Sequence, residues 1–379
     1  MRKSKRGDVD PFIVMDVMER ARAAEAAGRH IIHMEVGQPG TPAPTGARRA
    51  LSAAMEAGPL GYTVALGLPE LRARIARHYK EWHEVDLDPS RVVVTAGASA
   101  GFVLAFTALF DAGERVGLGL PGYPSYRHIL KALSLEPVGI ETIMSDRFQP
   151  RPDQIGTDLS GLIVASPGNP AGTMLSRDAL GALIARCHEA DVALISDEIY
   201  HGLHYDRPAV SALELTDDAF IINSFSKYYS MTGWRIGWMV VPESHVRRVE
   251  RLAQNLFICP SHASQVAALA AFDCDEELEA NRAVYAANRQ LMVDGLTEAG
   301  FPSFAPPDGA FYVYAKSDHL SEDALALSGR ILDEAGVAVT PGLDFDPARG
   351  GGMLRFSYAR ATGDIVEGLR RLKEWTERA

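Results

Sequence analysis

Cysteine is scarce in this chain of 379 residues, and long apolar runs are absent. The three cysteines, Cys187, Cys259 and Cys274, are far apart and form no C-x-x-C pair. So few scattered thiols provide neither a disulfide framework nor a zinc site, and we expect no metal and a reducing, cytoplasmic setting. No apolar run is long enough to span a bilayer, and the basic stretch at residues 1–6 is not followed by the apolar core of a signal peptide.

Basic residues are also in the minority. The chain has 38 lysines and arginines against 49 aspartates and glutamates, which gives a formal net charge of −11. Such a surface argues against nucleic acid or an anionic membrane as the main partner. It does not exclude a small anionic ligand, because a binding site can be locally cationic. Hydrophobic residues make up 47% of the chain, which is ample for a large core and predicts two domains.

Short apolar runs alternate with helical patterns through the first two thirds of the chain. We expect buried strands at residues 92–95, 115–120, 162–165, 192–195, 220–223 and 236–241. Continuous apolar strands that alternate with helices predict an α/β fold, with a mostly parallel central sheet covered by helices on both faces.

The C-terminal part has a different pattern, which predicts a smaller α+β domain with strands at 309–314, 336–340 and 353–357. A long alanine-rich helical region precedes it, at about residues 261–296. At the other end, Asp10 and Pro11 predict the N-terminal boundary of a helix that runs to about Gly28. We therefore place a large domain at residues 41–280 and a small domain at 281–379, with residues 1–40 packing on the small domain.

Polar residues follow several of the expected strands directly, at the carboxyl ends where open α/β sheets bind ligands. The turn before Ser99 opens a helix whose backbone amides favour a phosphate, although such small residues also serve close packing. Asp197 follows a buried strand, and a buried carboxylate needs a cation or a hydrogen-bond donor; a helix cap is the alternative role. Arg355 lies in an apolar strand and needs an anion, which is either a structural carboxylate or a substrate. Asn169 precedes a proline in a candidate cis peptide bond.

Lys227 lies in a turn rich in small residues, between the apolar runs that end near Asn223 and begin near Ile236. Partial burial and the cationic neighbour Arg235 would both lower the pKa of the lysine, which helps it react as a neutral amine. Arg235 is suited to hold a phosphate in its fixed fork. The segment indicates a Schiff-base lysine beside a phosphate-binding arginine, or else two ordinary cations at strand ends.

These motifs together resemble those of the class I/II aminotransferases, which are pyridoxal-phosphate enzymes of fold type I related to aspartate aminotransferase. The segment SFSKYYSMTGWRIG at 224–237 fits the lysine signature of that family. Further motifs follow the family's order along nearly the whole chain: VGQP at 36–39, GYT at 61–63, GLPELR at 67–72, VVVTAGAS at 92–99, PGYPSY at 121–126, SPGNPAGT at 166–173, SDEIY at 196–200, and GVAVTPG and MLRFSYA near the C-terminus. One departure is Gly168, where the family usually has asparagine.

The resemblance implies pyridoxal 5'-phosphate as the cofactor and a role for each matching residue. Lys227 would form the Schiff base and move the substrate proton, Asp197 would hold the ring nitrogen, and Tyr123 would stack on the ring. The implied contacts of the ring oxygen are Asn169 and Tyr200; those of the phosphate are Ala98, Ser99, Ser224, Arg235 and, from a second subunit, Tyr62; those of the substrate carboxylate are Arg355, Asn169 and Gly37. A tyrosine that acts across subunits implies at least a homodimer.

The implied activity is transfer of an amino group from an L-amino acid to a 2-oxo acid by a ping-pong mechanism. A C–S β-lyase, a decarboxylase or a racemase would use the same residues and remains an alternative. A non-catalytic pyridoxal-phosphate-binding regulator is a remote alternative, because the reactive residues are all present. The sequence does not identify the donor or the acceptor, and it contains no recognisable arginine for a second substrate carboxylate.

Overall fold

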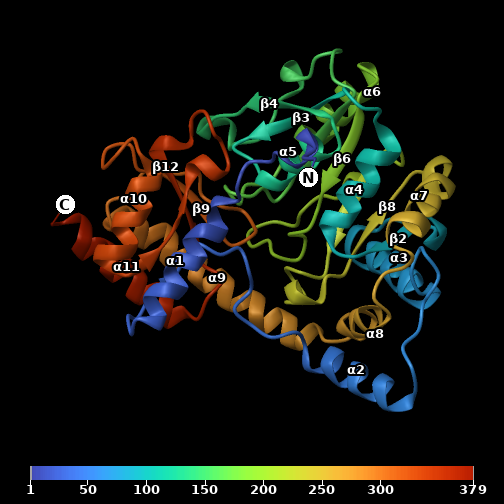
Figure 1. Cartoon of the computed structure of the whole chain (residues 1–379), viewed down its shortest axis with the longest axis horizontal. Helices are drawn as coiled ribbons and strands as arrows, with labels where there is room; N and C mark the ends of the chain where they lie inside the picture. The colour runs from blue at the N-terminus through green and yellow to red at the C-terminus, as the bar shows by residue number, and fades with distance from the viewer. Residues whose placement is uncertain (1, 379) are drawn as a thin grey trace.

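A seven-stranded sheet forms the larger part of the molecule in the computed structural model, which describes residues 2–378. Its strands are β2 (Val92–Thr95), β3 (Arg115–Leu120), β4 (Glu136–Glu141), β5 (Gly161–Ala165), β6 (Ala193–Asp197), β7 (Phe220–Ser224) and β8 (Gly237–Val240). They lie in the order β2-β8-β7-β6-β5-β3-β4, and the neighbours from β7 to β4 are all parallel. The strand β8 is antiparallel to both of its neighbours, β2 and β7. The prediction of a mostly parallel α/β sheet is confirmed (Figure 1).

The sheet is apolar on both faces because helices cover both. In β7, which is buried throughout, Ile221 packs into one core and Phe220 and Ile222 pack into the other. The helices of one face are α4 (Ala98–Leu109), α5 (Pro124–Ala132) and α7 (Glu243–Leu256); those of the other are α3 (Pro69–His83), α6 (Arg177–Glu189) and α8 (His262–Ala271). Strands with two buried faces have continuous apolar sequences, which is why they were predictable.

A smaller α+β part lies to the left in Figure 1, around the three-stranded antiparallel sheet β11-β12-β9. Its elements are α9 (Asp275–Glu298), β9 (Tyr312–Lys316), α10 (Ala324–Arg330), β10 (Val337–Ala338), β11 (Thr340–Pro341), β12 (Met353–Ser357) and α11 (Thr362–Thr376). The N-terminal elements α1 (Ile13–Ala26) and β1 (Ile32–His33) lie beside it, and β1 pairs in parallel with β10. The helix α2 (Thr45–Ala57) leads into the larger part. The boundary near residue 280 falls inside α9, and the two-domain division stays a prediction.

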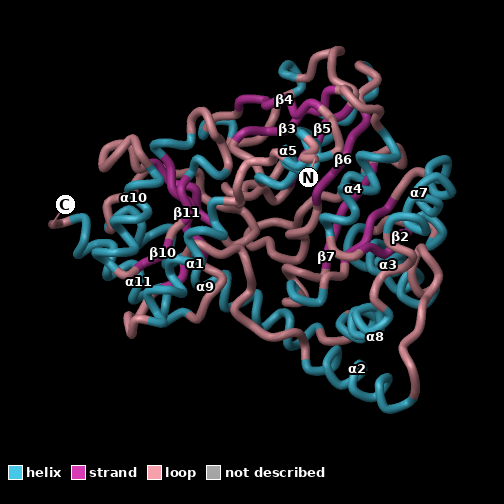
Figure 2. The backbone as a smooth tube through the Cα atoms, viewed as in Figure 1, coloured by secondary structure: helices cyan, strands magenta, loops and turns pink. Residues whose placement is uncertain are grey.

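The strands separate into two groups in Figure 2, with irregular segments between them. These segments include the ends of the strands and the turns that carry most of the predicted site residues. Among residues 2–378, no helix is both long and apolar enough to cross a membrane.

The predicted start of the first helix is wrong. The helix α1 begins at Ile13, and Asp10 instead pairs with Lys131 of α5, with 2.8 Å between carboxylate and amine. The cap comes from Asp344, whose carboxylate accepts the backbone N–H groups of Ile13 at 3.0 Å and Val14 at 3.2 Å. A cap supplied by a distant residue satisfies the free amides without any local sequence signal.

The predicted helical region at 261–296 is two helices, because the chain turns at residues 272–274. Phe272 at this turn is buried in the core, and three acidic residues at 275–277 suit the N-terminus of the second helix. The strand β4 and the helix α5 were not predicted. In β4 most side chains are partly or fully exposed, and Pro137 and Gly139 interrupt the apolar pattern, as is common in an edge strand.

Candidate active site

A cavity of about 320 Å³ lies between the two parts of the molecule, at the carboxyl ends of β5 and β6. This volume is typical of a small-molecule site. Strand ends and the following turns provide one wall, and residues of the N-terminal segment, β9 and β12 provide the other. All but two of the predicted site residues line it, namely Gly37, Ala98, Ser99, Tyr123, Asn169, Asp197, Tyr200, Lys227, Arg235 and Arg355.

The amine of Lys227 faces the cavity and donates a hydrogen bond of 2.6 Å to the carbonyl oxygen of Gly37. Its nitrogen lies 5.4 Å from the centre of the Tyr200 ring. Burial and, to a smaller extent, the positive charge of Arg355 lower the pKa of Lys227 to about 7, against the opposing effect of Asp197. A large fraction of this lysine is therefore neutral near pH 7, which makes it a nucleophile and a proton acceptor.

Asp197 is the last residue of β6 and is buried. Its carboxylate accepts the hydroxyl of Tyr126 and the backbone N–H of Ile199, the latter at 3.1 Å. Burial raises the pKa of Asp197 to about 6, and the two hydrogen bonds and Lys227 act in the opposite direction. The carboxylate has no ion-pair partner among the described residues, so it can accept a protonated nitrogen of a ligand.

Arg355, in β12, is a buried cation with no carboxylate within ion-pair distance among the described residues. It donates to the side-chain oxygen of Asn169 at 2.9 Å, to the hydroxyl of Thr340 at 3.2 Å and to the carbonyl of Glu35. Its Nε is buried and has no partner within the described chain. A buried guanidinium whose protein partners are all neutral is suited to a ligand anion.

Arg235 forms an anion-binding corner with the start of α4. Its guanidinium lies so close to Gly97 that a Cβ at that position would be 2.4 Å from Nη2, and Gly97 has a φ of +79°. Only glycine fits there without strain. The Nη1 of Arg235 donates to the carbonyl of Thr232 at 3.0 Å. The free amides of α4, which begins at Ala98, and the adjacent guanidinium together favour a phosphate.

Ser224 and Tyr62 do not line the cavity. The Ser224 hydroxyl lies 2.9 Å from the hydroxyl of Ser226, which does line it, and 3.2 Å from the carbonyl of Ile236. Tyr62 is on the surface, with 83% of its area exposed. The phosphate contacts of both residues stay predictions.

Sequence reasoning missed Tyr126 and Tyr312, which contact Asp197 and Tyr200 respectively. It also missed an apolar wall that the N-terminal segment contributes through Phe12, Val14 and Met18. Tyr126 lies in the PGYPSY motif at 121–126, and Tyr312 lies in the expected strand at 309–314. Position in a motif was the available signal, but the contacts themselves depend on the tertiary fold.

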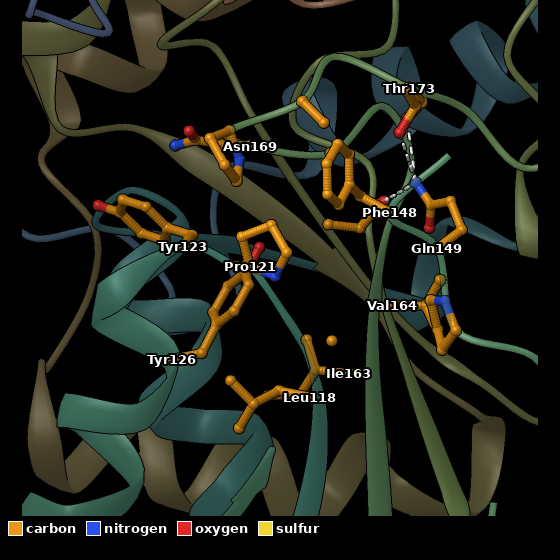
Figure 3. A pocket seen from close by; sticks show the side chains of 17 residues that line it. Leu118, Pro121, Tyr123, Tyr126, Phe148, Gln149, Ile163, Val164, Asn169 and Thr173 are labelled. Atoms are coloured by element: carbon orange, nitrogen blue, oxygen red, sulfur yellow. Dashed lines mark hydrogen bonds between the residues drawn. The ribbon is translucent and has the colours of Figure 1, made fainter. Parts of the chain in front are cut away.

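A second, small cavity of about 30 Å³ lies behind Tyr123 and Asn169, and its side chains are drawn in Figure 3. Within it, the amide of Gln149 donates to the carbonyl oxygens of Thr173 at 3.0 Å and Ala165 at 3.2 Å. These bonds close the loop that carries Asn169. The peptide bond between Asn169 and Pro170 is cis, which confirms that prediction.

Comparison with known proteins gives a consistent result. The family model "Aminotransferase class I and II" matches residues 29–372. The chain is 46% identical to a valine–pyruvate aminotransferase of Mycobacterium tuberculosis, over 99% of this chain and 98% of that protein. A crystal structure of an aminotransferase from the same organism superposes with a TM-score of 0.98 at 45% identity and covers all of both chains.

A more distant structure has the same fold. The aspartate aminotransferase of Thermus thermophilus, solved with maleate, superposes with a TM-score of 0.92 at 30% identity, over 99% of this chain and all of that one. The fold is therefore the fold type I arrangement that the motifs implied. With the family model matched over most of its length, this chain belongs to the class I and II aminotransferases.

Proposed function

We propose that this enzyme binds pyridoxal 5'-phosphate in the cavity and transfers an amino group from an L-amino acid to a 2-oxo acid. One observation carries the proposal: Lys227, Asp197 and Arg355 face the same cavity, and none of them has an ion-pair partner among residues 2–378. The residues fit the cofactor's chemistry. The neutral amine suits a carbonyl group, the buried carboxylate suits a ring nitrogen, and the corner of Arg235 and α4 suits a phosphate.

The cofactor, when bound, supplies an electron sink for negative charge at the substrate's Cα. Lys227 would hold it covalently, with Asp197 at its ring nitrogen and Tyr123 stacked on the ring. Asn169 and Tyr200 would donate to its ring oxygen, and Ala98, Ser99, Ser224 and Arg235 would hold its phosphate.

Residues of this chain bind the substrate, orient it and move a proton. Arg355 fixes the substrate through its α-carboxylate, with Asn169 already bonded to the guanidinium and Gly37 nearby. Lys227 would accept the proton from the substrate's Cα and later give it back, for which a pKa of about 7 is well matched. The relatives compared above are all aminotransferases, and no observation favours the lyase.

We also propose that the donor is a neutral amino acid with an aliphatic side chain. Phe12, Val14 and Met18 form an apolar wall of the cavity. The cations among its described lining residues are Lys227, Arg235 and Arg355, each of which has a role above, so none is left for a second carboxylate. The similarity to a valine–pyruvate aminotransferase supports valine as donor and pyruvate as acceptor.

We expect L-valine to be a donor with a kcat/KM at least about 10²-fold above that of L-aspartate, because an unpaired carboxylate against the apolar wall is costly. The measurement is the transfer of ¹⁵N from each labelled amino acid to pyruvate, followed by mass spectrometry of the alanine formed. Equal efficiency with aspartate would contradict the substrate class. Absence of transfer from every donor would contradict the function itself.

We propose further that the enzyme is a homodimer in which Tyr62 reaches the partner's cavity. Val64, two residues after Tyr62, is 56% exposed, and Leu256 and Ile258 are 52% and 55% exposed. The two segments lie together, since the N–H of Thr63 is bonded to the Cys259 sulfur at 3.4 Å. A second copy of the chain that packs on these two segments would cover their exposed apolar side chains.

A hybrid dimer tests the role of Tyr62. Subunits carrying Lys227→Ala and Tyr62→Ala are expressed together with different tags and purified as the heterodimer. If Tyr62 acts across the interface, one of the two sites is fully native, and we expect about half of the wild-type activity. If Tyr62 acts within its own subunit, the hybrid has no more activity than half that of the Tyr62→Ala homodimer, and the proposal is wrong.

A further inference from the structure

Tyr312 is a buried phenol that lines the cavity. It is the first residue of β9, and 1% of its area is exposed. Its hydroxyl lies 2.8 Å from the hydroxyl of Tyr200. Its ring lies 4.4 Å from the guanidinium carbon of Arg355. One side chain therefore contacts both a predicted cofactor ligand and the predicted substrate ligand.

Strand pairing explains how Tyr312 reaches Arg355. In the antiparallel pair of β9 and β12, Tyr312 is opposite Ser357 and Tyr314 is opposite Arg355. Tyr312 and Arg355 are thus diagonal neighbours, within reach of long side chains on the same face of the sheet. A planar guanidinium over an aromatic ring is favourable and limits the orientations of both groups.

The hydroxyl of Tyr312 also lies against Gly37. A Cβ at Gly37 would be 2.0 Å from this oxygen, which no real side chain could tolerate. The carbonyl oxygen of Gly37 is the acceptor for the amine of Lys227. The side chain of Tyr312 therefore limits how closely the segment around Gly37 can approach the cavity.

The hydroxyl of Tyr200 has a single hydrogen-bond partner within the described chain, which is Tyr312. A phenol can accept one hydrogen bond while it donates another. Either hydroxyl can donate in this pair. When Tyr312 donates, Tyr200 has its own proton free for an oxygen atom in the cavity, and such a chain of hydrogen bonds strengthens each member.

We propose that Tyr312 is a positioning residue for amino transfer, with two separable functions. Its hydroxyl aims the Tyr200 phenol at the oxygen of the bound cofactor ring, and its ring holds the guanidinium of Arg355 in place for the substrate carboxylate. The inference rests on the proposed function, because both ligands are those of the proposed reaction.

Two variants separate these functions. Tyr312→Phe keeps the ring and removes the hydroxyl, so we expect kcat to fall about 10-fold while KM for the amino acid changes little. When the visible absorption of the bound cofactor is titrated against pH, the midpoint should be at a higher pH in this variant than in the wild type. The reason is that Tyr200, without the Tyr312 hydroxyl, stabilises the ring oxygen anion less well. Tyr312→Leu also removes the ring, and we expect KM for the amino acid to rise about 10-fold in addition.

Tyr314→Phe is the matched control. Tyr314 is on the same strand and equally buried, but its hydroxyl has no partner among the described residues and it does not line the cavity. It should leave kcat, KM and the titration midpoint unchanged. Melting temperatures identify any variant that fails to fold.

A Tyr312→Phe enzyme with wild-type kcat and wild-type midpoint would overturn the role of the hydroxyl. A Tyr312→Leu enzyme with the same KM as Tyr312→Phe would overturn the role of the ring. Both results require a wild-type enzyme that transfers amino groups. A wild-type enzyme that does not do so would instead refute the proposed function.

Discussion

Replacement of Lys227 by alanine is expected to abolish amino transfer, with a fall in turnover of at least about 10⁴-fold. The lysine amine is the group in the cavity that can both bind a carbonyl carbon covalently and move a proton. No other lysine is among the described residues that line the cavity. The measurement is single-turnover amino transfer at saturating cofactor, together with mass spectrometry of the protein after borohydride reduction.

The control for this experiment is Lys316→Ala, at the exposed end of β9. We expect it to retain full activity and the covalent adduct. The wild-type protein gives a further check, because its pKa for Lys227 is about 7 instead of 10.5. Below that pKa the amine is protonated, so the rate of cofactor capture should rise with pH through about 7 and then level off. A rate that climbs until pH 10 or above, as for an ordinary lysine, would assign the adduct to another residue.

Replacement of Arg355 by alanine is expected to weaken the substrates far more than the cofactor. The guanidinium is buried, and loss of one partner from a buried, hydrogen-bonded charge pair costs about 2–5 kcal/mol. This cost corresponds to a fall of at least about 30-fold in kcat/KM, both for the amino acid and for its 2-oxo acid. Kinetics with both substrates and a cofactor titration measure the two effects separately.

Arg235→Ala is the complementary variant, since Arg235 lies beside Gly97 at the start of α4 and not beside Asn169. It should raise the dissociation constant of the cofactor and leave the relative preference among amino acids unchanged. Equal losses of substrate and cofactor in the Arg355 variant would mean that this arginine is structural. Conservative Arg355→Lys should restore only part of the loss, because a lysine lacks the planar fork.

The parts of the fold that were predicted best are those whose secondary structure depends mainly on residues close together in the sequence. The strand β3 was predicted at its observed bounds, and β2 likewise, because buried parallel strands are continuous apolar runs. Several of the predicted site residues lie at or just after the carboxyl ends of such strands, among them Tyr123, Asn169 and Asp197. Open α/β sheets bind ligands at these strand ends, while the role of each residue followed from the resemblance to a known family.

The features that were missed or wrong depend on residues far apart in the chain. Asp344 caps α1 across 331 positions, so Asp10 looked like the better cap. Tyr312 contacts Tyr200 across 112 positions, and nothing in the strand sequence distinguishes it from its neighbour Tyr314. Ser224 ends β7, and Ser226, two residues later, lines the cavity, so the phosphate contact of Ser224 stays a prediction.

The most direct test is an absorbance measurement on the purified protein, first with pyridoxal 5'-phosphate, then with L-valine alone, and finally with pyruvate. The expected result is a visible band that disappears in proportion to the number of sites when valine is added and returns when pyruvate is added, with one alanine formed per site. A cysteine conjugate is added to a separate sample in place of valine. A band that persists there while pyruvate and ammonia accumulate would instead indicate a lyase. Absence of any visible band after the cofactor is added would contradict the role of Lys227.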